Sequence, residues 1–146
     1  MIPAEEKRSS AALIPYKKVG NEFHFFLQKR TNDAIRNPGN FGLFGGGLEN
    51  GESPKEGLLR EVKEELNFVP ENYQLFTTFE SAYIFVHVYI LEVSDGFENT
   101  VKVSEGEYGK FLSLSDIKQE SKLSDLTRLI LKQLGEYLLD PEYRIK

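Results

Sequence analysis

The 146-residue chain is long enough for one domain, and its 40% hydrophobic residues suffice for a single core. It contains no cysteine, which excludes disulfides, thiolate metal sites and a cysteine nucleophile. The net charge of −5 argues against broad nucleic-acid binding, and the longest apolar run, residues 83–93, is too short to span a bilayer. We therefore expect one cytoplasmic domain over residues 1–146, with residues 1–8 as a loose tail and neither nucleic acid nor membrane as a partner.

The first part of the chain has the pattern of two strands and a glycine-rich stretch. Residues 9–16 are apolar and tolerate a β conformation, and residues 22–30 alternate in polarity, which predicts two strands joined by a turn at residues 17–21. Residues 31–40 contain Asn, Asp, Pro and Gly and are expected to form a loop. A short apolar run, residues 41–44, then meets three glycines.

A helix with clear local signals at both ends follows. Ser53 is its expected N-cap, Pro54 stands at the first helical position, and Glu56 completes a capping box. The helix should end near Asn67, with Pro70 close behind. Its apolar residues recur at helical spacing and predict one buried stripe, formed by Leu58, Leu59, Val62 and Leu66.

The remaining chain combines strands and helices. Residues 73–93 should supply two or three strands, residues 110–112 another, and Ser115 should open a brief helical turn. A final amphipathic helix is expected over residues 124–139, with a buried stripe of Leu126, Leu129, Ile130, Leu134, Tyr137 and Leu138. Strands on both sides of a central helix, with a helix at the end, predict a mixed α/β (α+β) domain.

The first helix also carries the chemistry. Glu61, Glu64 and Glu65 stand at i, i+3 and i+4, so we expect the three carboxylates to share one face, opposite the apolar stripe. Such like charges repel one another unless a hard cation neutralises them, and Mg²⁺ suits a site that also holds phosphate. A solvated acidic face is the competing interpretation of the triplet alone.

The glycines before the helix favour the metal site. Gly45, Gly46, Gly47 and Gly51 let the backbone pass close to a ligand, and the loop leads directly into the helix that bears the carboxylates. Gly57, on the helix itself, leaves room for that loop or for a ligand to approach. A glycine cluster alone usually indicates only a turn, and this one lacks the lysine of a P-loop.

Together these residues resemble the signature of the Nudix hydrolases. That signature reads glycine, five residues, glutamate, seven residues, Arg-Glu, an aliphatic residue, any residue, Glu-Glu, any residue, glycine and an apolar residue. The chain matches it in register at Gly46, Glu52, Arg60, Glu61, Val62, Glu64, Glu65 and Phe68. Asn67 stands where the signature has its second glycine, and asparagine is the usual substitute for glycine in the left-handed conformation.

The resemblance implies an α/β/α sandwich around a central mixed sheet, and a metal site. Glu61, Glu64 and Glu65 would bind two or more Mg²⁺ ions, or Mn²⁺, with a backbone carbonyl of Gly45 or Gly46 as a further ligand. Such metals would let an acidic protein hold a polyanion. Glu52 and Arg60 would form a pair that orients the ligating carboxylates.

A second acidic segment also resembles the family. In several Nudix enzymes an acid ahead of a late aromatic strand joins the metal site, and Glu105 is the first choice for it here, with Glu107 the second. A solvated loop acid is an equally good interpretation of either residue. The general base varies across the family and is left open among Glu64, Glu61 and Glu105.

The implied reaction is Mg²⁺-dependent hydrolysis of a phosphoanhydride bond in a nucleoside diphosphate linked to another group. A nucleoside triphosphate is the first choice of substrate, and a dinucleoside polyphosphate or nucleotide sugar is the alternative. A non-catalytic nucleotide-binding domain is the alternative of another class. Arg30, like Lys29 and Arg36, could meet phosphates or be an ordinary charge at a strand end or in a loop. Phe41 and Tyr83 could either stack on a base or belong to the core.

Overall fold

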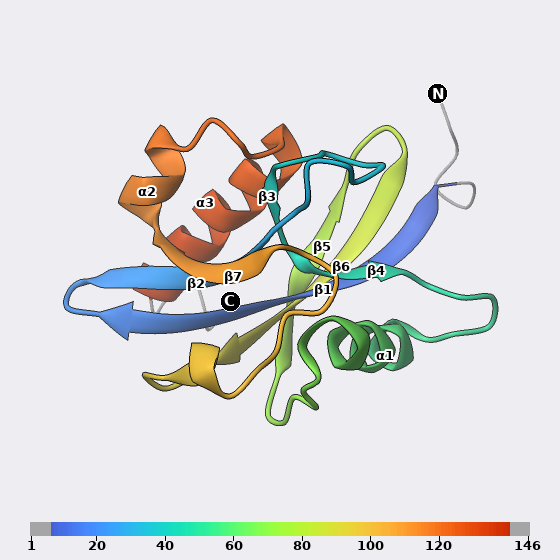
Figure 1. Cartoon of the computed structure of the whole chain (residues 1–146), viewed down its shortest axis with the longest axis horizontal. Coiled ribbons are helices and arrows are strands. Elements are labelled where there is room, and N and C mark those ends of the chain that lie inside the picture. Colours follow the sequence, from blue (N-terminus) through green and yellow to red (C-terminus); the bar gives the residue numbers. More distant parts are fainter. Residues whose placement is uncertain (1–6, 141–146) are drawn as a thin grey trace.

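The computed structural model describes residues 7–140, and in this part of the chain a seven-stranded sheet separates α1 from α2 and α3 (Figure 1). No helix among these residues has the length and apolarity needed to cross a membrane. In chain order the elements are β1 (Arg8–Val19), β2 (Glu22–Lys29), β3 (Phe41–Gly42), β4 (Phe44–Gly47), α1 (Pro54–Leu66), β5 (Gln74–Glu80), β6 (Ile84–Glu92), the 3-10 turn η2 (Phe97–Asn99), β7 (Tyr108–Ser113), α2 (Leu114–Gln119) and α3 (Asp125–Leu139).

The sheet is mixed, as expected. Its main path runs β3-β2-β1-β6-β5, while β4 pairs with β1 and β7 with β2. The long central strands β1 and β6 are parallel, with Ala11 opposite His87, and the other pairings are antiparallel. The expected mixed α+β class is therefore confirmed.

Both faces of the sheet are covered, which explains why β1 is apolar without alternation. Ala11 and Leu13 point toward α1, whereas Ala12 and Ile14 point toward α3. Fully burying an aliphatic side chain contributes roughly 1.5–3 kcal/mol, so these two layers hold the helices on the sheet. The helices contribute Leu58, Val62 and Leu66 from α1, and Ile130, Leu131, Leu134 and Leu138 from α3.

The ends of α1 follow the local signals in its sequence. Ser53 Oγ accepts from the Glu56 backbone N–H at 3.2 Å, and the Glu56 carboxylate accepts from the Ser53 N–H at 2.9 Å. At the other end Asn67 is left-handed, with φ 53° and ψ 44°, and its N–H donates to the Lys63 carbonyl. The predicted capping box and asparagine cap are both confirmed.

The strand boundaries differ from the prediction where tertiary pairing extends them. β1 begins at Arg8, within the expected tail, and continues through the expected turn to Val19, because it pairs with β2 as far as Val19 and Glu22. Only Gly20, at φ 62°, and Asn21 form the turn itself. β2 ends at Lys29, one residue earlier than expected, and residues 1–6 lie outside the described residues.

The strands and helices in the second half of the chain also differ in places from the prediction. Residues 73–93 form two strands, and the second helix begins at Leu114 with Ser113 as its N-cap, so the proposed start at Ser115 was wrong. The predicted stripe of α3 was wrong at Leu129, which is 45% exposed. Leu131 is buried in its place, because the sheet covers a slightly rotated face of the helix.

Candidate active site

The glycines lie in β4, where the strand passes directly over α1. Gly45 N–H donates to Glu65 Oε1 at 2.8 Å, and Gly45 has a φ of 141° that few other residues tolerate. A Cβ on Gly46 would lie 2.7 Å from the Glu61 carboxylate. The glycines therefore belong to the sheet, where the lack of side chains lets β4 contact two carboxylates of α1. The space at Gly57 is taken up by Leu48 of the loop, since a Cβ there would collide with that side chain.

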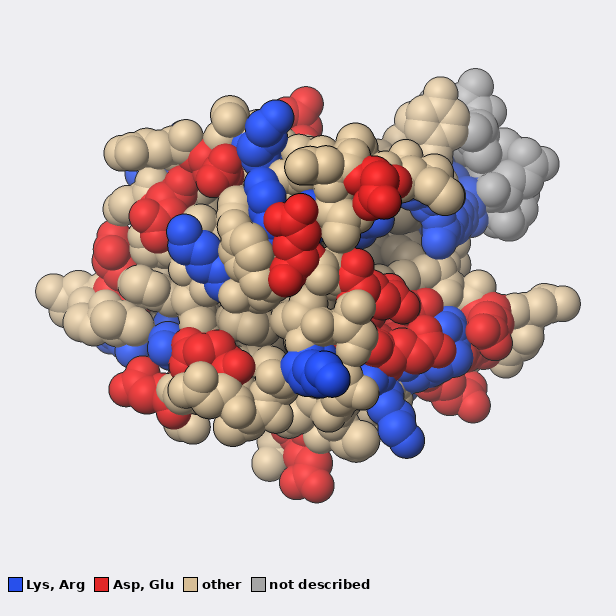
Figure 2. All heavy atoms as spheres, viewed as in Figure 1, with Lys and Arg blue, Asp and Glu red and all other residues tan. Residues whose placement is uncertain are grey.

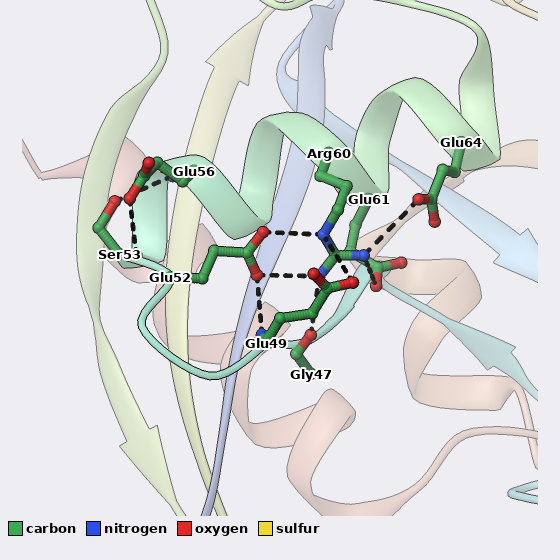
Figure 3. Close-up of polar contacts among 8 residues, drawn as sticks. All are labelled: Gly47, Glu49, Glu52, Ser53, Glu56, Arg60, Glu61 and Glu64. Carbon is green, nitrogen blue, oxygen red and sulfur yellow. Dashed lines mark hydrogen bonds and ion pairs between the residues drawn. The ribbon is translucent and has the colours of Figure 1, made fainter.

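Arg60 joins the loop to the carboxylates of α1 (Figure 3). Its Nε and Nη2 donate to the two oxygens of Glu52 at 2.8 and 3.0 Å, and Nη2 also reaches the Gly47 carbonyl at 3.1 Å. Its Nη1 donates to Glu61 Oε1 at 2.9 Å. Glu52 accepts a further bond from the Glu49 N–H at 2.8 Å. One guanidinium thus fixes the loop, the helix and a candidate metal ligand together.

The Glu52–Arg60 pair stays ionised at physiological pH. The hydrogen bond from Arg60, followed by the backbone hydrogen bond from Glu49, lowers the pKa of Glu52 to about 2. Hydrogen bonding to Glu52 likewise raises the pKa of Arg60 above its usual range. Neither group exchanges a proton near neutral pH, which suits the orienting role expected for the pair and not a role as acid or base.

Glu65 corrects the expectation that three carboxylates share one face opposite the apolar stripe. It is only 3% exposed, whereas the side chain of Glu64 is 50% exposed. At 100° per residue Glu65 lies about 20° from Leu58 and Glu64 about 120° from it, so Glu65 belongs to the buried side of α1. Burial raises the pKa of Glu65 to about 8; the Gly45 N–H opposes this rise, and the charges of Glu61 and Glu105 add to it.

A cavity of about 650 Å³ opens beside these groups. Glu65 and Glu105 line it together with Gly45, Gly46 and Gly47, and so do Arg8, Arg30 and Arg36. Phe41, Val86, Leu126 and Ile130 supply apolar wall. Figure 2 shows acidic side chains gathered over α1 beneath a hollow in the surface, with basic side chains at its upper right edge. The volume and mixed lining are those of a small-molecule site.

Sequence and structure comparisons agree on the family of this chain. A model of the NUDIX domain matches residues 6–134. The chain belongs to the Nudix hydrolases. It is 30% identical to the 8-oxo-dGTP diphosphatase of Escherichia coli (strain K12) over 110 residues, which cover 74% of this chain and 82% of that protein.

Solved structures share the Nudix fold. The MutT protein from Methanosarcina mazei Go1 superimposes with a TM-score of 0.67 at 25% identity, covering 94% of this chain and 100% of that one. The NUDIX domain of Shewanella oneidensis NrtR, solved with ADP ribose, gives a TM-score of 0.72 at 19% identity over 90% of this chain and 88% of that chain. The expected Nudix-like sandwich is thereby confirmed.

The donor groups at this Nudix site fit a hard divalent cation. Among the described residues no three acidic or histidine side chains converge on one point. Arg60 is bonded to Glu61 and lies 3.7 Å from Glu64. However, the carboxyl group of Glu65 is buried beside Glu61 and Glu105, and each of these charges disfavours its ionisation. A bound cation would remove that repulsion, and oxygen ligands of this kind suit Mg²⁺ or Mn²⁺.

Two of the three predicted substrate-binding residues lie at the cavity, and the third does not. Arg30 and Phe41 line the cavity; Arg30 Nε donates to the Arg36 carbonyl at 2.8 Å, which ties the loop at residues 31–40 to the end of β2. Phe41 is 5% exposed and lies under Lys29, whose Nζ is 4.9 Å from the ring centroid. Tyr83 is 73% exposed and is absent from the cavity lining, so its interpretation as a core residue was wrong.

Three further parts of the lining were missed by sequence reasoning. Arg8 was assigned to a loose tail, yet it lies in β1 and lines the cavity. Ser124 and Thr127 contribute from the start of α3. Gln28 is 3% exposed, and its Nε2 has no hydrogen-bond partner among the described residues. No clear signal marks Gln28 in the sequence, because β2 also contains Glu22, His24 and Lys29, and only the structure shows that this polar side chain is buried.

Proposed function

We propose that this Nudix hydrolase carries out Mg²⁺-dependent hydrolysis of a phosphoanhydride bond in a nucleoside triphosphate, with Mn²⁺ as a substitute metal. One observation carries the proposal: Glu65 of the Nudix helix, Glu105 and three arginines line the same cavity, which is large enough for a small ligand. The likeness to an 8-oxo-dGTP diphosphatase supports a nucleoside triphosphate as the substrate.

The proposed metal ligands are Glu61, Glu64, Glu65 and Glu105, with a carbonyl of Gly45 or Gly46. When bound, the cation would neutralise phosphate charge and lower the pKa of the attacking water. The protein's own contribution is to keep the carboxylates in place. Arg60 holds Glu61 through a hydrogen bond, and the Gly45 N–H holds Glu65. Residues that orient ligands in this way commonly matter 10- to 100-fold for metal affinity or activity, as a rough guide.

The substrate would lie with its phosphates between the acidic edge and the arginines. Arg8 and Arg30 border the cavity and supply positive charge near the proposed metal site, with Arg8 beside Gly47. The apolar wall, which includes Phe41 and Ile130, is suited to a base. An acidic protein can therefore bind a polyanion, because the metal and these arginines offset its net charge.

The general base is proposed to be Glu64, Glu61 or Glu105. A base must accept a proton near the working pH, and Glu52, whose pKa is about 2, does not meet that requirement. Glu64 is half exposed and lies 3.7 Å from Arg60, and Glu105 lines the cavity itself. Each of the three candidates can be replaced by glutamine, which keeps the shape of the side chain but cannot take the proton.

The test is a panel of nucleoside triphosphates, dinucleoside polyphosphates, nucleotide sugars and ADP-ribose, assayed with Mg²⁺ and analysed by chromatography of the products. We expect a nucleoside triphosphate to give the monophosphate and pyrophosphate. Glu64→Gln should reduce the rate by roughly 100-fold or more. Glu71→Gln, which changes an exposed carboxylate outside the cavity lining, is the matched control. No turnover on any compound, with Glu64→Gln binding nucleotide as the parent does, would refute the enzymatic proposal.

A further inference from the structure

The one departure from the Nudix signature, Asn67, makes contacts that glycine could not make. Its side-chain Nδ2 donates to the Lys102 carbonyl at 3.1 Å and to Ser104 Oγ at 2.7 Å. Glycine at this position would supply only the left-handed backbone that ends α1. The asparagine therefore adds a connection between the end of the Nudix helix and a segment 35–37 residues further along the chain.

Backbone hydrogen bonds bring the same segment to the helix. The Lys102 N–H donates to the Leu66 carbonyl at 3.0 Å, and the Ser104 N–H donates to the Glu65 carbonyl at 2.8 Å. Carbonyls in the last turn of a helix have no partner within it, so this segment satisfies two of them. The residue that precedes Glu105 is thus bonded directly to a proposed metal ligand, Glu65.

The chain is anchored again immediately after Glu105. The Glu107 N–H donates to the Lys29 carbonyl at 2.8 Å, and a Cβ on Gly106 would lie 2.7 Å from that same oxygen. Glu105 therefore stands between one anchor on α1 and another on β2. Since residues 101–104 belong to no helix or strand, the anchor on α1 depends on the bonds to Asn67, Leu66 and Glu65.

We propose that Asn67 is a positioning residue that holds Glu105 at the metal-binding edge of the cavity. This inference rests on the proposed function, because it takes Glu105 as a ligand of the catalytic cation. The side chain of Asn67 fixes Ser104, and Ser104 sets the direction in which the chain presents Glu105. Asn67 itself contacts neither metal nor substrate.

The test measures Mn²⁺ binding to the full chain by electron paramagnetic resonance, which counts the free ion and does not require turnover. Asn67→Gly restores the residue of the family signature, keeps the left-handed backbone and removes only the side-chain bonds. Ser104→Ala removes the accepting hydroxyl without changing the helix end. Asn72→Gly is the matched control, since Asn72 is also left-handed, at φ 61°, and exposed.

We expect Asn67→Gly and Ser104→Ala each to weaken Mn²⁺ binding by about three- to tenfold, as suits the loss of one or two hydrogen bonds. The double variant should bind Mn²⁺ little more weakly than Asn67→Gly alone, because Asn67→Gly already removes the bond to Ser104. In a Glu105→Gln background, Asn67→Gly should have no further effect on Mn²⁺ affinity. Asn72→Gly should bind Mn²⁺ as the parent does.

The inference is overturned if Asn67→Gly binds Mn²⁺ as tightly as the parent, or if it weakens binding equally in the Glu105→Gln background. It is also overturned if Glu105→Gln alone leaves Mn²⁺ affinity unchanged. If the parent nevertheless hydrolyses nucleotide in that case, the proposed function still stands. Conversely, the expected binding pattern in a protein that hydrolyses no nucleotide would refute the proposed function alone. A parent that binds no Mn²⁺ refutes both.

Discussion

Replacing Glu65 by glutamine should remove a pH dependence from the stability of the metal-free protein. The amide has nearly the same shape as the carboxyl group and keeps an oxygen to accept the Gly45 N–H, but it cannot ionise. Glu65 is 3% exposed, and its pKa rises from 4.5 to about 8 in the folded protein. Below pH 4.5 both states hold the proton, so burial of the group carries no charge penalty there.

The stability contribution of this carboxyl group is lost as the pH rises from 4.5 to about 8, because the unfolded chain ionises first. A difference of 8 − 4.5 pKa units at about 1.36 kcal/mol each gives an upper bound of about 5 kcal/mol. Burial also lowers the pKa of His87, which acts in the opposite direction by making the folded state more stable as the pH rises through 6.5. The difference between parent and variant isolates the contribution of Glu65.

The assay is urea unfolding at pH 5 to 9 with EDTA present. Glu65→Gln should become more stable than the parent as the pH rises, by an amount that levels off above pH 8. Glu64→Gln, on the exposed side of the same helix, should keep the parental pH dependence. A Glu65→Gln variant with the same pH dependence as the parent would show that this carboxyl group does not titrate as its burial requires.

Three further substitutions test the site and its helix. Gly46→Ala places a methyl group 2.7 Å from the Glu61 carboxylate, so we expect at least a tenfold loss of kcat and a higher Mg²⁺ requirement; unchanged Mg²⁺ titration curves would contradict this. Arg60→Lys keeps the charge but loses the paired bonds to Glu52, and steady-state kinetics should show roughly a 10- to 100-fold fall in kcat. Ser53→Ala removes the N-cap and should lower the free energy of unfolding by about 1 kcal/mol in urea titrations, with kcat retained.

Local interactions determined the parts of this protein that could be predicted from its sequence. The bounds of α1 follow from a capping box at Ser53 and a left-handed residue at Asn67, which depend on neighbours within a few positions. The Nudix signature also lies almost entirely within this helix and the loop before it. The family, the mixed fold and the pairing of Glu52 with Arg60 were therefore accessible from the sequence.

The tertiary structure decided how the carboxylates differ from one another. Glu65 is buried because β4 pairs with β1 and places Gly45 above it, and that pairing depends on residues far apart in the chain. Arg8 and Glu105 line one cavity for a similar reason. Arg8 lies in β1 and Glu105 just before β7, and both strands pair with β2. Helical spacing specifies which side chains share a face of α1. The strand packed on that face determines which carboxylate is buried and desolvated.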